Sequence, residues 1–400
     1  MAKGAVTQAA GFLAAGIACG LKRSGKRDLA LIHCPGGATA AAMFTTNKIV
    51  SAAVDVARRH ARNARIYAVV INSGNANACT GQKGIKDAIA MCQTTAKHVG
   101  AEPHHVLVAS TGIIGHPLPI AKVKAGIASA AAALASSTAA GQDFARAIMT
   151  TDTRCKEAVG AVRISGKDVT IGGTAKGAGM IGPNMATTIS VITTDAAISK
   201  SMLQKAMAAA VGSSLNKLTV DGHQSTNDTA VVLASGAAGN PPITRPDARY
   251  RAFAAALMGV CEDLTRQMAL DAEGATRMFK VIVAGAATQA EAAKAARAVA
   301  DYDLVKCAVH GGDPNWGRII CAVGSCGVRL DEKKLACKIG DIGVFAKGRP
   351  IKFDAAKVSD VIRKEYHTIT IQLGAGNHTD FCYGCDLSRG YVTINADYHT

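Results

Sequence analysis

The sequence is poor in aromatic and charged residues for its length. Aromatic residues make up 4% of the 400 residues and charged residues 18%, whereas 49% of the chain is hydrophobic, with Ala, Val, Ile and Gly as its bulk. This composition is typical of closely packed α/β layers and excludes a disordered or fibrous protein. A chain of this length can bury a large core, so neither a disulfide nor a metal is needed for stability. The low charge predicts that another subunit covers part of the surface.

Apolar runs of membrane-spanning length are missing. Residues 9–20 are apolar, but Gly11, Gly16 and Gly20 interrupt them and four basic residues follow within 22–27. We expect a strand and a turn there and not a signal peptide. No run reaches the ~20 residues of a membrane span. The sequence therefore predicts a soluble, cytoplasmic protein with no membrane partner.

The twelve cysteines lack the spacing of a metal site. Cys382 and Cys385 form a single C-x-x-C, and Cys321 and Cys326 do not supply the second pair that a structural zinc site needs. Cysteines scattered through apolar stretches are typical of buried free thiols in a reducing compartment. We expect no metal.

Acidic residues are scarce in the first half of the chain. The whole chain has 45 Lys and Arg against 29 Asp and Glu, a net charge of +16, and residues 1–186 hold 21 of the basic and 8 of the acidic residues. Such a basic N-terminal half could bind nucleic acid, or it could steer a small acidic substrate into a cleft. Neither a basic strand interleaved with aromatic residues nor a helix-turn-helix pattern accompanies the charge. RNA binding is therefore the weaker alternative, and no nucleic-acid partner is expected.

Strand-like runs alternate with Ala-rich helical runs, which predicts a mixed α/β fold. Strands are expected at 66–71, 106–109, 279–283 and 304–309, and a hairpin at 161–171; helices are expected at 121–140, 143–149, 250–270 and 289–300. Thr288 is expected to cap the last helix, with Glu291 at the capping-box position. Residues 240–246 are the best loop or linker candidate, and residues 310–318 suit a turn.

Three glycines, Gly177, Gly179 and Gly182, spell the G-x-G-x-x-G pattern of a dinucleotide loop. That loop needs a strand before the glycines and a helix that begins within them. Here Pro183 follows the last glycine, and residues 187–194 are β-branched at seven of eight positions, which favours a strand. The context excludes a nucleotide loop.

A different chemistry suits the residues after these glycines. Ala186 places little bulk beside its carbonyl, so the hydroxyl of Thr187 can attack that carbon, shift the acyl group to oxygen and, after hydrolysis, cut the chain. Thr187 then carries a hydroxyl nucleophile and a free α-amine, whose reference pKa of ~7.7–8.0 makes it a usable base. The same threonines also suit an ordinary strand, and Thr188 lies adjacent, so the spacing leaves both interpretations open.

Residues 176–187 resemble the self-cleavage segment of the ornithine acetyltransferase family, also called ArgJ or glutamate N-acetyltransferase. The resemblance spans nearly the whole chain and includes residues 11–16, 44–47, 72–77, 110–115, 149–153, 219–222, 225–228, 273–276, 313–318, 384–387 and 394–398. It implies a layered α-β-β-α sandwich of the self-cleaving ArgJ/DmpA type, with a smaller C-terminal α/β domain from about residue 280.

The resemblance also implies an activity. Acetyl would pass from N2-acetylornithine to L-glutamate in arginine biosynthesis, by a ping-pong route through an acetyl-threonine. Some members also use acetyl-CoA, and no bound cofactor is implied. Cleavage between Ala186 and Thr187 would give a light chain, 1–186, and a heavy chain, 187–400, which assemble as a heterotetramer of two light and two heavy chains. A related N-terminal-threonine amidohydrolase or aminopeptidase is the alternative.

Matched by motif, Thr187 is the nucleophile, and Thr111 and Gly112 form the oxyanion hole. The substrate-binding residues implied by the resemblance are Thr153, Lys176, Thr187, Glu273, Asn395 and Thr400. An ammonium at Lys176 suits a substrate carboxylate, and a carboxylate at Glu273 suits the side-chain amine of ornithine. The chain departs from the family pattern at Thr188, at His223-Gln224 and at residues 310–312, which puts substrate preference in doubt.

Overall fold

An eight-stranded sheet organises the first two thirds of the chain in the computed structural model, which describes residues 3–182 and 188–397. Its strand order is β4-β3-β2-β8-β7-β6-β5, and β1 pairs with β2 beside this path. The strands are β1 (Leu13–Ile17), β2 (Leu29–Phe44), β3 (Ile66–Asn75), β4 (Val106–Ile113), β5 (Lys156–Ile164), β6 (Lys167–Lys176), β7 (Ile189–Thr194) and β8 (Thr229–Ala234).

The long strand β2 folds this sheet into two facing layers. Its first part pairs with β3 and its last six residues pair with β8, with a register shift between His33 and Ala38. Pro35, Gly36 and Gly37 occupy the shift, and Gly37 has a φ of 69° that favours glycine. The two layers bury a common core that includes Phe12, Ile32 and Val231.

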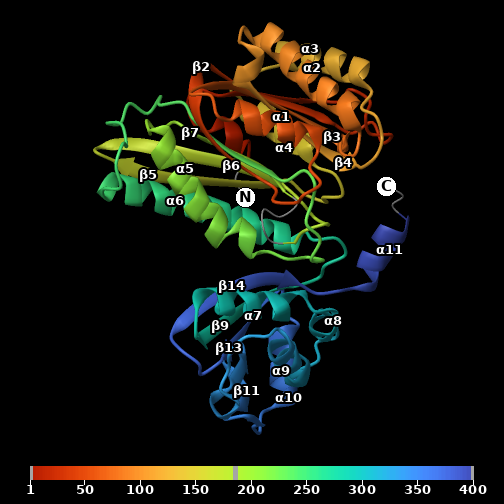
Figure 1. Ribbon diagram of the computed structural model, residues 1–400, viewed down its shortest axis with the longest axis vertical. Helices are drawn as coiled ribbons and strands as arrows, with labels where there is room; N and C mark the ends of the chain where they lie inside the picture. The colour runs from red at the N-terminus through yellow and green to blue at the C-terminus, as the bar shows by residue number, and fades with distance from the viewer. Residues whose placement is uncertain (1–2, 183–187, 398–400) are drawn as a thin grey trace.

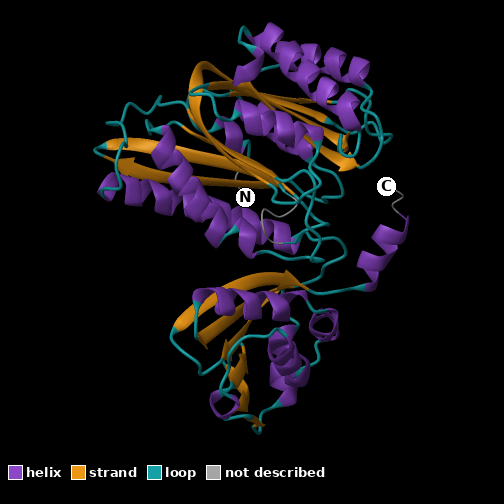
Figure 2. Cartoon of the chain, viewed as in Figure 1, coloured by secondary structure: helices purple, strands orange, loops and turns teal. Residues whose placement is uncertain are grey.

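Helices cover both outer faces of the layered sheet. Helices α1 (Ala52–His60), α2 (Gly81–Val99) and α3 (Ile120–Ala132) pack on one side, and α5 (Lys200–Ser213) and α6 (Ala248–Leu270) pack on the other, while α4 (Thr138–Ile148) lies against β1 and the central core (Figure 1, Figure 2). The side chains of Ser51, Ser137, Ser199 and Asp247 cap α1, α4, α5 and α6. The predicted α-β-β-α sandwich is confirmed.

A second, six-stranded sheet forms the smaller unit. Its order is β12-β11-β10-β13-β9-β14, with strands β9 (Met278–Ala286), β10 (Ala336–Ile339), β11 (Ile342–Ala346), β12 (Arg349–Pro350), β13 (Tyr366–Gln372) and β14 (His378–Cys385). It packs with α7 (Gln289–Asp301), α8 (Asp303–Gly311), α9 (Trp316–Ser325) and α10 (Ala355–Ile362) around a core of its own. Helix α11 (Arg389–Asp397) projects from this unit back toward the larger sheet (Figure 1).

Most of the elements predicted from the sequence are present, with three errors. The strand expected at 304–309 is helix α8, because helical spacing buries Val305 and Val309 together and leaves Cys307 exposed. The helix expected at 121–140 ends at Ala132, and the next begins at the cap Ser137. The turn expected at 310–318 is shorter than predicted, because α8 continues to Gly311 and α9 begins at Trp316; residues 240–246 form the expected loop.

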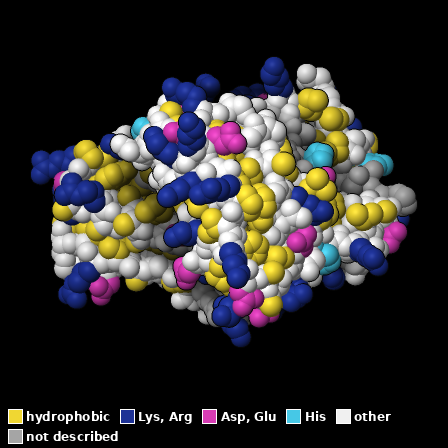
Figure 3. Space-filling model, turned by 90° about the horizontal axis from the view of Figure 1, so that it is seen from below, with side chains coloured by type: hydrophobic (Ala, Val, Ile, Leu, Met, Phe, Trp, Pro, Cys, Tyr) yellow, Lys and Arg dark blue, Asp and Glu magenta, His cyan; other side chains and the backbone are white. Residues whose placement is uncertain are grey.

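Within the described residues, no helix is long and apolar enough to cross a membrane, and no cluster of possible metal ligands occurs. On the face of the molecule in Figure 3, lysine and arginine side chains outnumber acidic ones and are spread singly.

Candidate functional site

The described site residues lie at strand ends and in the segments that follow them. Thr111 and Gly112 stand near the end of β4, Lys176 ends β6, and Thr153 precedes β5, while Glu273 lies between α6 and β9 and Asn395 lies on α11. Ala186, Thr187 and Thr400 lie outside the described residues. The described oxyanion and binding candidates therefore come from five different parts of the chain.

Thr111 and Gly112, the residues predicted to form the oxyanion hole, lie at the end of the parallel strand pair β3–β4. Gly112 has a φ of 132°, and a Cβ atom there would lie 2.5 Å from the backbone nitrogen of Asn75, so only glycine fits. The side chain of Asn227 donates to the backbone carbonyls of Ala76 and Ser110, both at 2.7 Å, and ties this edge to β8. The geometry fixes the Thr111–Gly112 peptide against two neighbouring segments.

Lys176 joins the oxyanion residues to a buried acidic group. Its ammonium donates to the hydroxyl of Thr111 at 3.1 Å, and the side chain is almost completely buried. Burial lowers the pKa of Lys176, and Asp152 opposes that shift. Asp152 also accepts from the backbone N–H of Gly177 at 2.8 Å, which positions the chain directly after Lys176.

A buried charge network lies beneath Lys176. Lys156 is fully buried and forms ion pairs with both Asp152 and Asp271. Burial works to raise the pKa of Asp152, but the charges of Lys156 and Lys176 outweigh it and lower that pKa to about 2. The hydroxyl of Thr153 donates to Asp271, so Thr153 belongs to this network from its exposed side.

Sequence reasoning missed the three charged members of this network. The four-residue spacing of Asp152 and Lys156 could have indicated one of these ion pairs. Asp152 stands in the motif 149–153, from which only Thr153 was predicted as a site residue. The pairing of Lys156 with Asp271 joins residues more than 100 positions apart, and no local pattern predicts it.

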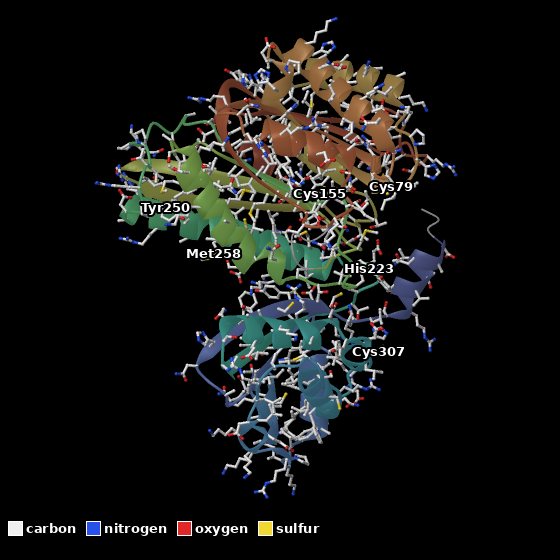
Figure 4. The ribbon with its side chains drawn as sticks, viewed as in Figure 1. Cys79, Cys155, His223, Tyr250, Met258 and Cys307 are labelled. Atoms are coloured by element: carbon white, nitrogen blue, oxygen red, sulfur yellow. The ribbon has the colours of Figure 1, made fainter. Side chains whose placement is uncertain are left out.

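Hydrogen bonds to Asp152, Asp221 and Glu273 hold residues 177–182, which lead to the proposed cleavage site. The N–H of Met180 donates to Asp221 at 2.7 Å, and the N–H of Glu273 donates to the carbonyl of Ala178 at 2.9 Å. A Cβ atom at Gly179 would lie 2.6 Å from Oε1 of Glu273, so this glycine leaves room for the glutamate carboxylate. His223, labelled in Figure 4, lies in the same loop as Asp221, near the boundary between the larger and the smaller unit.

Thr188 is buried and directly precedes β7. Its carbonyl accepts from the N–H of Thr229 at 3.0 Å, and β6 and β7 pair so that Lys176 stands opposite Ile189. Lys176 and Thr188 are therefore both anchored in the same corner of the larger sheet.

Asp228 is a second residue that sequence reasoning left without a role. It precedes β8, is 1% exposed, and neither carboxyl oxygen has a hydrogen-bond partner among the residues that the structure describes. Burial raises the pKa of Asp228 well above its usual value, although Lys176 acts to lower it. A titratable group without a partner beside Lys176 and Thr188 marks this corner as chemically unusual.

Glu273 and Asn395 meet although 122 positions separate them. The side-chain amide of Asn395 donates to Oε2 of Glu273 at 2.9 Å, and Ser388 donates to the carbonyl of Gly274. These contacts pin α11 against the segment that follows α6. Two predicted binding residues are thus placed together.

A cavity of about 1110 Å³ opens beside the ends of β3 and β4. It is lined by Gly20, Leu21, Lys22, Arg23, Ser24, Lys26, Arg27, Gly74, Asn75, Ile113, His116, Pro119, Lys122, Arg146, Met149, Thr150, Asp152 and Asp397. Asp152 connects the cavity to the network beneath Lys176, and Asn75 connects it to the oxyanion edge. A small-molecule substrate can enter here.

Comparison with known proteins identifies the family. A sequence model of the ArgJ family matches residues 13–400. The chain is 47% identical over 399 residues to the arginine biosynthesis bifunctional protein ArgJ of Symbiobacterium thermophilum, with 99% of each chain covered, and 44% identical over 394 residues to that of Caldanaerobacter subterraneus, covering 98% and 97%. The crystal structure of the ArgJ protein of Bacillus halodurans is similar at 40% identity and a TM-score of 0.50, covering 52% of this chain and 97% of that one. The chain belongs to the ArgJ family.

Proposed function

We propose that this member of the ArgJ family transfers acetyl from N2-acetylornithine to L-glutamate in arginine biosynthesis, through an acetyl ester on Thr187. Relatives that match it end to end are arginine biosynthesis bifunctional proteins, and acetyl-CoA as a second donor suits that description. The observation that carries the assignment is the Lys176 ammonium bonded to Thr111 at the corner where Thr188 leads into β7. We place the enzyme in the cytoplasm, as expected of a biosynthetic pathway.

The nucleophile would be released by self-cleavage. The Thr187 hydroxyl attacks the carbonyl carbon of Ala186, the peptide C–N bond breaks, and an ester joins the two residues. Water then hydrolyses the ester, which leaves a carboxylate on Ala186 and a free hydroxyl and α-amine on Thr187. The Bacillus halodurans chain supports a divided polypeptide, because nearly its full length matches only 52% of this chain. The pieces would be 1–186 and 187–400.

Acetyl transfer would then follow a ping-pong course. The α-amine of Thr187 takes the hydroxyl proton as the oxygen attacks the acetyl carbon, and it returns the proton to the departing ornithine amine. Glutamate enters, its amine attacks the acetyl ester, and the Thr187 hydroxyl is regenerated. Thr111 and Gly112 would donate to the oxyanion in both steps, and the loss of one such donor typically costs ~10²–10³ in rate. Lys176 polarises the Thr111 hydroxyl that it contacts, which makes it a stronger donor.

Thr153, Glu273, Asn395 and Thr400 would complete the substrate site, with Glu273 facing the side-chain amine of ornithine. The Asn395–Glu273 bond supports a shared role for two of them. We propose a heterotetramer of two light and two heavy chains. Val392 on α11 is 62% exposed and Ile394 38%, an apolar surface that a second copy would cover.

The deciding experiment compares Thr187→Ala with Thr188→Ala by intact mass and by transferase rate. We expect Thr187→Ala to remain one uncut chain without activity, and Thr188→Ala, the matched control, to give two pieces. Cleavage of Thr187→Ala, or failure of Thr188→Ala alone to cut, would refute the assignment. Assays with and without glutamate separate the transferase from an amidohydrolase or aminopeptidase, which would release acetate to water at an unchanged rate.

A further inference from the structure

The two substrates of the proposed reaction carry side chains of opposite charge. The carboxylate of Glu273 suits the cationic side chain of ornithine, but it repels the side-chain carboxylate of glutamate. Lys176 is bonded to Thr111 and lies among Asp152, Lys156 and Glu273, so it is not free to serve that second carboxylate. The acceptor therefore needs a separate cationic contact, and this inference rests on the proposed function.

The cavity beside β3 and β4 places a lysine within reach of the oxyanion edge. A Cβ atom at Gly74 would lie 3.2 Å from Cγ of Lys22, and one at Gly112 would lie 2.7 Å from Cα of Gly74. Lys22 therefore packs against Gly74, and Gly74 packs against Gly112. Its ammonium interacts electrostatically with Lys176 and Asp152 as well, which places it on the active-site side of the cavity.

The cavity wall carries an excess of positive charge. Six lysines and arginines line it against two acidic residues, Asp152 and Asp397. Arg27 and Arg146 both pair with Asp143, and Asp152 pairs with Lys156. Arg23 and Lys26 form no ion pair or side-chain hydrogen bond with any described residue. The uncompensated charge lies mainly on the segment 22–26.

Lys22 is the member of this wall that gains most from an anion. Its ammonium donates to the backbone carbonyl of Arg27 at 2.6 Å, and burial lowers its pKa to about 8. Asp28 lies close, but its carboxylate accepts from the backbone N–H groups of Cys19, Leu21 and Lys22, which hold the loop. A substrate carboxylate would restore the charge–charge contact that the half-buried ammonium lacks.

We propose that Lys22 binds the side-chain carboxylate of the acyl acceptor and that the segment 22–26 thereby selects an acidic acceptor. Glu273 then receives the donor's cationic side chain and Lys22 receives the acceptor's anionic one. The donor uses the Glu273 contact while it passes its acetyl group to Thr187. The acceptor uses the Lys22 contact while it takes the acetyl group from Thr187. Lys22 acts by binding and takes no part in the chemical step.

The experiment compares Lys22→Met with the matched control Lys124→Met, a lysine of α3 outside the cavity lining. Acetyl transfer is measured with glutamate and with its neutral isostere glutamine. We expect Lys22→Met to lower kcat/KM for glutamate ~10–100-fold through KM, with glutamine changed less than about threefold. The burst of ornithine that acetylornithine releases before any acceptor is added should not change, because Lys22 does not contact the donor's side chain in this proposal. The control should match the parent protein for all three.

A second measurement covers the case in which glutamine is too slow to assay. Glutarate keeps both carboxylates but lacks the attacking amine, and its inhibition constant should rise in Lys22→Met by the same factor as the KM for glutamate. Equal losses for glutamate and glutamine, or an unchanged glutarate constant, overturn the proposal. A parent protein that transfers no acetyl at all refutes the proposed function instead, so the two failures are distinguishable.

Discussion

Replacement of Lys156 by Met tests the buried network under the active site. Lys156 pairs with Asp152 and Asp271, and the three side chains are 0%, 0% and 4% exposed. Removal of the ammonium leaves two buried carboxylates without their closest cation, which typically costs about 3–5 kcal/mol of unfolding free energy. At roughly 2 °C per kcal/mol for a unit of this size, the thermal midpoint should fall by about 6–10 °C.

The chain offers a control with the same spacing at the surface. Lys83 pairs with Asp87, four residues after it, whereas Lys156 pairs with Asp152, four residues before it; the Lys83 side chain is 55% exposed and that of Asp87 is 9% exposed. Lys83→Met should cost less than ~1 kcal/mol, because water screens an exposed pair. Urea unfolding of both variants measures the difference between burial and exposure directly.

The loss of stability in Lys156→Met should depend on pH, and the pKa of Asp152 gives the direction of that dependence. A carboxyl whose folded pKa is lowered to about 2, as that of Asp152 is, stabilises the fold above its unfolded pKa, and this stability is lost as pH falls through about 2. The deficit of Lys156→Met should therefore shrink below about pH 4, where carboxyls begin to protonate. Adding Asp271→Asn to Lys156→Met should recover part of the loss. Equal shifts for Lys156→Met and Lys83→Met, or a deficit independent of pH, would refute the reasoning.

Three other outcomes follow from the site. Gly179→Ala should displace the Glu273 carboxylate and raise the KM for acetylornithine ~10-fold, with the thermal midpoint unchanged, because the clash is with a flexible side-chain end. The KM for glutamate should rise as pH increases through about 8, where Lys22 loses its proton, and Lys22→Met should abolish this rise. In the uncut Thr187→Ala background, Asp228→Asn should raise the melting temperature at neutral pH. A buried carboxyl with a raised pKa costs stability above its unfolded pKa, so this gain should vanish toward about pH 4.

The sequence predicted helix ends and small-residue turns well because their chemistry is local. Thr288 accepts from the N–H of Glu291 at 3.2 Å, as the capping box predicts, and Ser165 takes the positive φ of the expected hairpin turn. The strand expected at 304–309 was wrong because β-branched residues also suit a helix when burial recurs every fourth residue. Val305 and Val309 are that case.

The site residues show the same difference: those in contiguous motifs were predicted, and those that only tertiary packing brings together were not. Thr111, Gly112 and Lys176 came from contiguous motifs, and the structure joins the first and last of them by a hydrogen bond. The burial of Lys156 and Asp228 could not be predicted, because in the sequence a buried charge looks the same as a solvated one. Only tertiary packing decides whether a carboxylate meets water, an ammonium or nothing.

The pairing of β6 with β7 has a consequence for the life of the mature enzyme. Residues 171–176 bond to residues 189–194 across the proposed break, and β2 bonds to β8 in the same way. A severed chain would keep these ladders, so its halves would part only by melting. Once melted, strands that a short tether had brought together would have to find each other by diffusion. Maturation would thus make folding a one-time event, and heat damage to the cut form permanent.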